Sequence, residues 1–265
     1  MIWDWSFLSA ELSAWRRAGR RPQLWWRDDD AVAASQSLER LLSIASYAGV
    51  PLSLAVIPER VEKSLAALVN FRRSVTVMQH GTDHWPASGR GAPTQFPPAV
   101  PADVIAAWLS SARAPMRQFH HRLPVYAPPW NDLQDNVVAA LPMAGFRGVS
   151  GFDGAGPATS LRRVDTHLDL MRWSPAPRFR GEGRFLRRMT RLLRTRRRQG
   201  AWDEPIGLLT HHLDHDEAAW AFLQKLLRRR DLKAQADWRS AADLFGAGAA
   251  EPTRPVHGYE TALVS

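Results

Sequence analysis

Gln23-Leu-Trp-Trp-Arg-Asp-Asp-Asp30 decides the fold, because an apolar and aromatic run ends there in three consecutive carboxylates. Residues 23–27 predict a buried strand. Adjacent carboxylates repel one another unless a cation or solvent compensates them, although acids at this point also suit the start of a helix. Further along, Ser74-Val-Thr-Val-Met-Gln-His-Gly-Thr-Asp-His84 predicts a second strand that ends at His80. One Asp and two His from neighbouring strand ends would form a three-ligand metal site of the catalytic type.

The rest of the chain alternates predicted strands with predicted helices. Strands are expected at 23–27, 51–57, 74–79, 125–126, 147–150, 163–170 and 206–210, and helices at 5–20, 35–48, 61–70, 101–122, 135–144, 179–199 and 216–230. This order is typical of a largely parallel sheet or barrel, whose active sites form beyond the carboxyl ends of the strands. We expect one domain over residues 1–246 with an N-terminal helix at 5–20, and a loose tail at 247–265.

Composition limits the class of protein. A chain of 265 residues with 45% hydrophobic content is long enough for one large α/β domain. The absence of cysteine excludes disulfides, zinc ribbons and thiol nucleophiles, and it fits a reducing compartment. Asp4 and Glu11 interrupt the first apolar residues, so the start does not read as a secretory signal. We therefore expect a cytoplasmic protein.

The formal net charge of +9 is concentrated in residues 184–198 (RFLRRMTRLLRTRRR). On a helix this segment would bury one apolar face and expose its arginines. The simplest interpretation is a core-packed helix with a solvated basic face. The alternative is a peripheral contact between 184–198 and an anionic membrane or an acidic polymer. No nucleic-acid-binding module or Gly-rich phosphate loop is recognised, so no nucleic-acid partner is expected.

Further polar clusters follow other predicted strands. His211, His212 and His215 come after the strand at 206–210, and they form either an exposed polar turn or the source of a general acid. The stretch 163–170 alternates, so one of its faces would present Asp165, His167 and Asp169 together. Most of the 12 tryptophans must be core residues, but Trp85 and Trp130 flank polar motifs and are candidates for stacking on a sugar ring.

Taken in order, these motifs resemble the polysaccharide deacetylase family (carbohydrate esterase family 4, the NodB-homology domain). The family's Thr-Phe-Asp-Asp-Gly motif matches residues 26–30, which implies that Asp28 is the catalytic base and Asp29 a metal ligand. Its His-(Ser/Thr)-x-x-His motif matches residues 80–84, which implies that His80 and His84 are the other two ligands.

Two weaker motifs follow in the same order. The family's Arg-Pro-Pro-Tyr segment resembles residues 127–130, and its Leu-x-His motif resembles residues 208–212, which implies that His211, or else His212, is the catalytic acid. The chain departs from the family at three positions, where Asp30 replaces Gly, Gly81 replaces Ser or Thr, and Ala127 replaces the arginine that steadies the base. The candidates to replace that arginine are Arg27 and Arg172.

The resemblance implies an α/β fold, a distorted (β/α) barrel of about seven strands, and a divalent metal, most plausibly zinc. The implied reaction is removal of an N-acetyl group from a sugar or glycan precursor. The expected substrate-binding residues are Asp30, Trp85, Pro129, Trp130, His167 and Asp169. Three alternatives stay open: a metal-dependent amidohydrolase acting on a non-sugar amide, a catalytically impaired carbohydrate-binding relic, and a membrane-surface or polyanion-binding scaffold.

Overall fold

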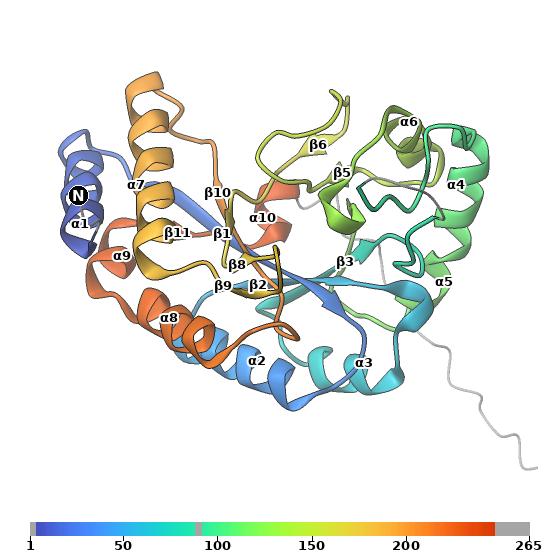
Figure 1. Ribbon diagram of the computed structural model, residues 1–265, viewed down its shortest axis with the longest axis horizontal. Helices are drawn as coiled ribbons and strands as arrows, with labels where there is room; N and C mark the ends of the chain where they lie inside the picture. The colour runs from blue at the N-terminus through green and yellow to red at the C-terminus, as the bar shows by residue number, and fades with distance from the viewer. Residues whose placement is uncertain (1–3, 88–91, 247–265) are drawn as a thin grey trace, which may run out of the picture.

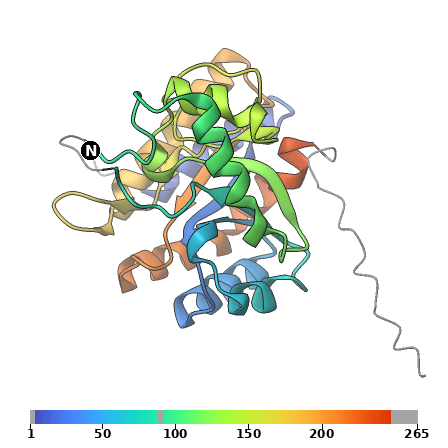
Figure 2. The same cartoon turned by 90° about the vertical axis from the view of Figure 1, so that its right-hand side faces the viewer.

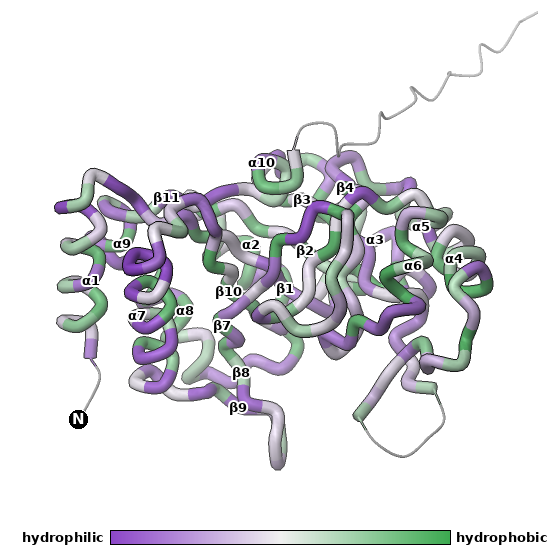
Figure 3. Tube along the Cα trace, turned by 90° about the horizontal axis from the view of Figure 1, so that it is seen from above, coloured by the Kyte–Doolittle hydropathy of each residue, from purple (hydrophilic) through white to green (hydrophobic). Residues whose placement is uncertain are grey.

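The computed structural model describes residues 4–87 and 92–246, and its centre is one large sheet. The strands are β1 (Gln23–Ala31), β2 (Leu52–Val56), β3 (Val75–His80), β4 (Arg122–Ala127), β5 (Gly148–Val149), β6 (Arg162–Arg163), β7 (Leu168–Asp169), β8 (Met171–Arg172), β9 (Arg178–Phe179), β10 (Ile206–Thr210) and β11 (Asp237–Trp238). Their order in the sheet is β6-β5-β4-β3-β2-β1-β10-β7, with β11 beside the start of β1. Every pair in it is parallel. The antiparallel β8–β9 hairpin projects from the body (Figures 2 and 3).

Helices cover the outside of the sheet (Figure 1). They are α1 (Trp5–Arg17), α2 (Gln36–Ala48), α3 (Lys63–Val69), α4 (Ala102–Ser111), α5 (Arg113–Met116), α6 (Asp135–Met143), α7 (Glu182–Gln199), α8 (Glu217–Arg228), α9 (Arg230–Gln235) and α10 (Ala241–Phe245). The predicted α/β architecture with a parallel sheet is confirmed. Several edge strands are only two residues long, so the described sheet contains more strands than the expected seven. The predicted tail at 247–265 lies outside the described residues.

Helix α7 has the amphipathic character that its sequence predicts. Phe185, Leu186, Met189 and Leu193 are buried against the core, whereas several of its arginines are exposed. Figure 3 shows the two kinds of residue alternating along the helix. Helix α1 packs beside α7, where the indole of its Trp15 donates to the Leu193 carbonyl at 3.1 Å. Within the described residues, no helix has the length and apolar character needed to cross a membrane.

Two predicted elements are broken in the structure. The helix expected at 101–122 divides into α4 and α5 and ends at Met116. The alternating strand expected at 163–170 is wrong, because its first part, β6, pairs with β5 and its last part, β7, pairs with β10. Between them, the carboxylate of Asp165 accepts the backbone N–H groups of Gly151 and Gly154. Asp165 is therefore a structural residue of this turn.

Strand β1 continues through the three aspartates, whereas the sequence predicts that it ends before them. It pairs with β10 as far as Asp28 and with β2 as far as Ala31. The register with β2 shifts between these two residues, as in a β-bulge. Asp30 has a φ of 72°, a left-handed conformation that Asp tolerates better than most residues. The bulge turns the third carboxylate away from the regular alternation of the strand.

Gly207 in β10 is packed closely against the backbone of the neighbouring segment. A Cβ atom there would lie 2.7 Å from the Thr166 Cα atom and 2.8 Å from the Asp165 carbonyl oxygen, both backbone atoms. We expect Gly207→Ala to lower the free energy of unfolding by at least about 1–3 kcal/mol, the usual cost of overpacking. Gly148→Ala is the matched control, because it would meet the movable ring of Phe245 and should cost less. Urea unfolding of both variants tests this, and equal losses would contradict it.

Candidate metal centre and active site

Asp30, His80 and His84 form a cluster whose possible ligand atoms all lie within 4.8 Å of one another. Oδ1 of Asp30 is 3.3 Å from Nε2 of His80 and 3.4 Å from Nε2 of His84. The Nδ1–H of His80 donates to the carbonyl of Ala127 at 2.9 Å, which leaves Nε2 as the ligand atom. Oδ1 of Asp30 is buried and has no hydrogen-bond partner in the described chain. An unpartnered buried carboxylate oxygen facing two imidazole nitrogens fits a divalent cation.

The charges of the cluster fit the same conclusion. Burial alone would raise the pKa of Asp30, but the imidazoles of His80, His211 and His84 lower it well below its ordinary value. Burial alone would lower the pKa of His80, but the carboxylates of Asp29 and Asp30 raise it. Without a metal, His80 therefore tends to hold a proton close to Asp30. A metal must displace that proton, so its affinity should fall at acidic pH.

The backbone around the cluster is strained. Asp30, His84, Trp130 and Asn131 have φ values of 72°, 61°, 53° and 56°, in the left-handed region that non-glycine residues rarely adopt. Such conformations persist only where the surrounding structure enforces them, and they gather at functional sites. The four residues come from β1, from the loop after β3 and from the loop after β4.

Gly81 lies between the two His ligands and also has a positive φ, of 64°. A Cβ atom there would lie 2.5 Å from Cγ of Pro129 and would also collide with Oε1 of Gln95. The departure from the family motif at this position is therefore a steric requirement of the loop packing.

Asp29, the predicted metal ligand, does not join the cluster. Its two oxygens accept from Nε and Nη2 of Arg27 at 2.7 and 2.9 Å, in a bidentate buried salt bridge. Arg27 is 0% exposed and also donates to Ser150 and Asn131. The structure brings Asp30 rather than Asp29 to the two His, because strand alternation puts Asp29 on the same face as Arg27 and the bulge turns Asp30 towards the imidazoles.

Asp28, the predicted catalytic base, is also placed elsewhere. It is 0% exposed and accepts from Oγ1 of Thr210 at 2.6 Å and from Nδ1 of His212 at 2.5 Å. It also accepts the backbone N–H of His212 at 3.1 Å. Asp28 and His212 thus form a buried pair that joins β1 to the end of β10, and neither residue lines the cleft at the metal cluster. The structure thus places these two predicted catalytic residues in a buried pair outside the cleft, and their catalytic role stays a prediction.

A cleft of about 580 Å³ lies over the Asp30–His80–His84 cluster. His211 lines it, with Nε2 3.9 Å from Oδ2 of Asp29 and its ring edge-on to Trp173 at 4.5 Å between centroids. The Trp130 ring lies 4.4 Å from the ring of His84. The lining residues are Asp30, His80, His84, Ala92, Pro93, Trp130, Asn131, Asp132, Phe152, Asp169, Trp173, Arg180 and His211.

Only some of the predicted substrate-binding residues line the cleft. Trp130 and Asp169 line the cleft, and Asp30 does so as part of the metal cluster. Trp85 is 67% exposed and does not line it, and Pro129 is buried under the loop of Gly81. His167 lines a neighbouring cavity instead.

Seven of the lining residues were not predicted from the sequence, and three of these supply aromatic surface or a cation. These three are Phe152, Trp173 and Arg180. Phe152 and Trp173 contribute aromatic surface, and Arg180 contributes a cation. None of them belongs to a motif, because each is brought to the cleft by loops whose path depends on the tertiary structure.

No family model and no curated protein matches the chain. A Mycobacterium smegmatis protein assigned as a polysaccharide deacetylase superposes with a TM-score of 0.59 at 15% identity, covering 89% of this chain and 95% of that one. A peptidoglycan N-acetylglucosamine deacetylase superposes with a TM-score of 0.53 at 11% identity, covering 85% and 88%. The fold is the NodB-like deacetylase barrel.

The NodB-like barrel also occurs without activity. A carbohydrate esterase family 4 pseudoenzyme from Bacillus anthracis superposes with a TM-score of 0.52 at 13% identity, covering 86% of this chain and 66% of that one. Identities at this level establish the fold alone. Whether the chain is an enzyme therefore depends on its own residues.

The metal assignment can be tested by replacing one carboxylate at a time. We expect Asp30→Ala to weaken zinc binding by more than about 100-fold, because it removes a direct ligand, whereas lost supporting contacts typically cost 10- to 100-fold. Asp29→Asn is the matched control and should retain one bound metal per chain. Calorimetric titration of zinc into EDTA-treated protein measures both. Loss of metal in Asp29→Asn with retention in Asp30→Ala would restore the original ligand set.

The Asp28–His212 pair predicts a particular dependence of stability on pH. Burial alone would raise the pKa of Asp28, but the charge and hydrogen bond of His212 lower it. Burial alone would lower the pKa of His212, but the charge of Asp28 raises it. The Asp28 contribution is lost as pH falls through that lowered pKa, and the His212 contribution is lost as pH rises through that raised pKa.

We therefore expect Asp28→Asn to cost about 3–5 kcal/mol of unfolding free energy, the usual effect of breaking a buried pair. The cost should be greatest between about pH 4 and pH 6.5, the ordinary pKa values of the two groups, and should shrink at alkaline pH. Urea unfolding from pH 4 to pH 9 measures it. Glu217→Gln, which removes an exposed partner of Arg40, is the control and should have little effect. A cost that does not vary with pH would contradict the ion pair.

Proposed function

We propose that the chain is a metal-dependent deacetylase that hydrolyses an N-acetyl group on a sugar or glycan precursor. The observation that carries the proposal is the grouping of the Asp30–His80–His84 cluster and His211 around one cleft, with the buried carboxylate of Asp29 3.9 Å from Nε2 of His211. The deacetylase fold and the aromatic walls of the cleft add support. We propose zinc as the metal, because an Asp and two His with open positions suit it.

Asp29 is the proposed general base. A divalent cation at the cluster would supply Lewis-acid activation of water and of the amide carbonyl. Asp29 would take the proton of the attacking water, because it directly precedes Asp30 in β1 and its Oδ2 lies 3.9 Å from Nε2 of the cleft residue His211. The bidentate salt bridge to Arg27 holds that carboxylate in one orientation, so little reorganisation is required during proton transfer.

His211 is the proposed general acid. It lines the cleft, and its Nε2 lies on the side of Asp29, where a substrate amide nitrogen could receive a proton. The edge of Trp173 restricts the rotation of its ring. His212 is not available for this task, because its Nδ1 is bonded to Asp28. Trp130, Phe152 and Trp173 offer aromatic surface on which a sugar ring can stack.

Ala127 does not argue for a catalytically impaired relic. The guanidinium that steadies the base comes from Arg27 on β1, two residues before Asp29. The backbone carbonyl of Ala127 orients the metal ligand His80. The position therefore keeps a supporting role in the cluster although the arginine side chain is missing.

Acetate release tests the proposal. The zinc-loaded chain should release acetate from at least one member of a panel of N-acetylated mono- and oligosaccharides. Asp29→Asn should keep the metal but lower kcat by about 10²- to 10⁴-fold, the usual range for a positioned proton acceptor. Asp103→Asn is the control, because Asp103 is exposed at the start of α4, and it should be unaffected. If acetate is released only from N-acetyl amino acids, the substrate is a non-sugar amide. If neither class releases acetate, the proposal is refuted.

A further inference from the structure

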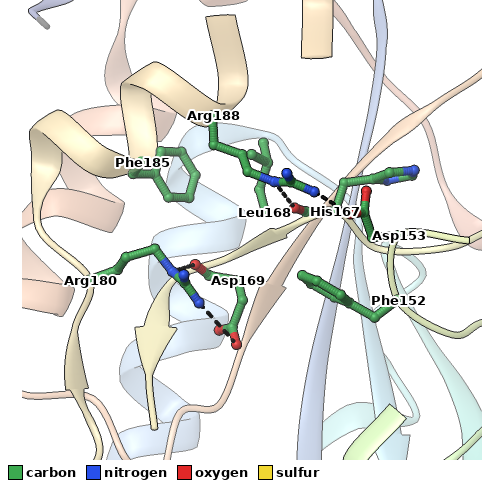
Figure 4. Close-up of a pocket in the computed structure, with 8 residues that line it drawn as sticks. All are labelled: Phe152, Asp153, His167, Leu168, Asp169, Arg180, Phe185 and Arg188. Carbon is green, nitrogen blue, oxygen red and sulfur yellow. Dashed lines mark hydrogen bonds and ion pairs between the residues drawn. The ribbon is translucent and has the colours of Figure 1, made fainter. Parts of the chain in front are cut away.

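A second cavity, of about 270 Å³, opens beside the metal cleft. Phe152, Asp169 and Arg180 line both spaces, so the cavity is a side branch of the cleft. Figure 4 shows Arg180 and Arg188 reaching into this region from the α7 side, with Asp169 and Asp153 opposite them and the ring of Phe152 nearby. A substrate whose amide lies at the metal cluster could place a substituent in this side cavity.

The two arginines of the side cavity each have guanidinium N–H donors that are not used in hydrogen bonds within the described residues. Arg180 donates from Nε to the Asp169 carbonyl at 3.0 Å and from Nη2 to the Met171 carbonyl at 2.7 Å. Its distance to the Asp169 carboxylate is 3.8 Å, so this ion pair is loose. Arg188 donates from Nε to the His167 carbonyl at 3.3 Å and from Nη2 to Asp153. In the part of the chain that the structure describes, Nη1 of both arginines lacks a hydrogen-bond partner.

Three further arginines lie on the β8–β9 hairpin and on α7, close in sequence to residues that line the side cavity. Arg172 and Arg178 face each other across the β8–β9 hairpin, a like-charge pairing that is unfavourable unless an anion compensates it. Arg184, one turn before Arg188 on α7, is exposed. Within the described residues, these three arginines form no ion pair. None of these three arginines lines the cavity, whose lining holds two arginines and two carboxylates, so an anion there would rely on Arg180 and Arg188.

The remaining walls are apolar. Leu168 and Phe185 are buried at 4% and 1% exposure, and they line the cavity together with Phe152. Such a floor excludes water from one side of a bound group, which strengthens its hydrogen bonds to the guanidinium groups. Guanidinium groups match the geometry of phosphate oxygens, which accept paired N–H donors.

We propose that this side cavity binds a phosphate-class oxyanion carried by the substrate, with Arg180 and Arg188 as its donors. The inference rests on the proposed function for the occupant of the main cleft, and it narrows the substrate to a phosphorylated acetamido sugar or its lipid-linked form. The phosphate group lies on the Phe152 and Asp169 side of the cleft, away from the scissile amide.

Binding of inorganic phosphate to the full chain tests the side cavity without reference to activity. Calorimetric titration is carried out at low ionic strength, on zinc-loaded and on EDTA-treated protein. We expect saturable binding in both, and Arg188→Gln should weaken it by about 10- to 100-fold, the loss of a charged hydrogen-bonding partner. Arg191→Gln is the matched control, since it removes the same charge from the same helix at an exposed position outside the cavity, and it should change affinity by less than about twofold.

A third variant should change the affinity in the opposite direction. Asp153→Asn removes the carboxylate that pairs with Arg188, so it should tighten phosphate binding several-fold. A misfolded variant would not bind more tightly. Equal losses in Arg188→Gln and Arg191→Gln, or binding that requires zinc and ignores Arg188→Gln, would overturn the proposal in favour of diffuse attraction or of phosphate on the metal.

The source of the phosphate is separated by competition. N-acetylglucosamine 1-phosphate and vesicles containing phosphatidic acid are each tested for displacement of inorganic phosphate. Displacement by the sugar phosphate supports a soluble substrate, displacement by the vesicles alone supports a lipid-linked one, and displacement by neither overturns the proposal. If phosphate binds as expected but no N-acetyl sugar releases acetate, the proposed function fails and the anion site stands. If acetate is released but Arg188→Gln leaves phosphate binding unchanged, the anion site fails and the proposed function stands.

Discussion

The buried salt bridge between Arg27 and Asp29 is the interaction on which the site depends. Three adjacent carboxylates would repel one another strongly in the core, and each is compensated by a different group. Arg27 forms an ion pair with Asp29, and Thr210 and His212 at the end of β10 donate hydrogen bonds to Asp28. The bulge then turns Asp30 towards two imidazoles. Removing either partner of such a buried pair typically costs about 3–5 kcal/mol, so the arrangement is strongly enforced.

Because each of the three carboxylates has a different partner, each is suited to a different role. The carboxylate bound by a guanidinium keeps one orientation, which suits a proton acceptor. The carboxylate without a hydrogen-bond partner suits a cation, and the one bonded to His212 holds two strands together. Strained backbone at Asp30, His84, Trp130 and Asn131 surrounds the same point. The stability that enforces this strain comes from the sheet and its covering helices, in which the largest hydrophobic core lies.

The roles of the arginines that give the chain its positive charge depend on where they lie. Helix α7 uses its apolar face for the core, and Arg194 and Arg197 pair with the buried Glu11 of α1. Arg188, in the second turn of α7, and Arg180, just before the helix, line the side cavity instead. A contact of 184–198 with an anionic membrane stays a prediction, and it is compatible with a substrate that carries phosphate on a lipid.

The α/β barrel, the order of its strands and helices, and the pair His80 and His84 were readable from the sequence, because periodicity and ligand spacing are local properties. His211 was also readable, since it follows β10 directly. The roles of the three aspartates were not, because the β-bulge at Asp30 and the partners of Asp28 and Asp29 depend on which strands become neighbours. The same holds for Phe152, Trp173 and Arg180, which loops carry to the cleft. Local patterns set which side chains can act, whereas long-range strand pairing decided which of them join the Asp30–His80–His84 cluster.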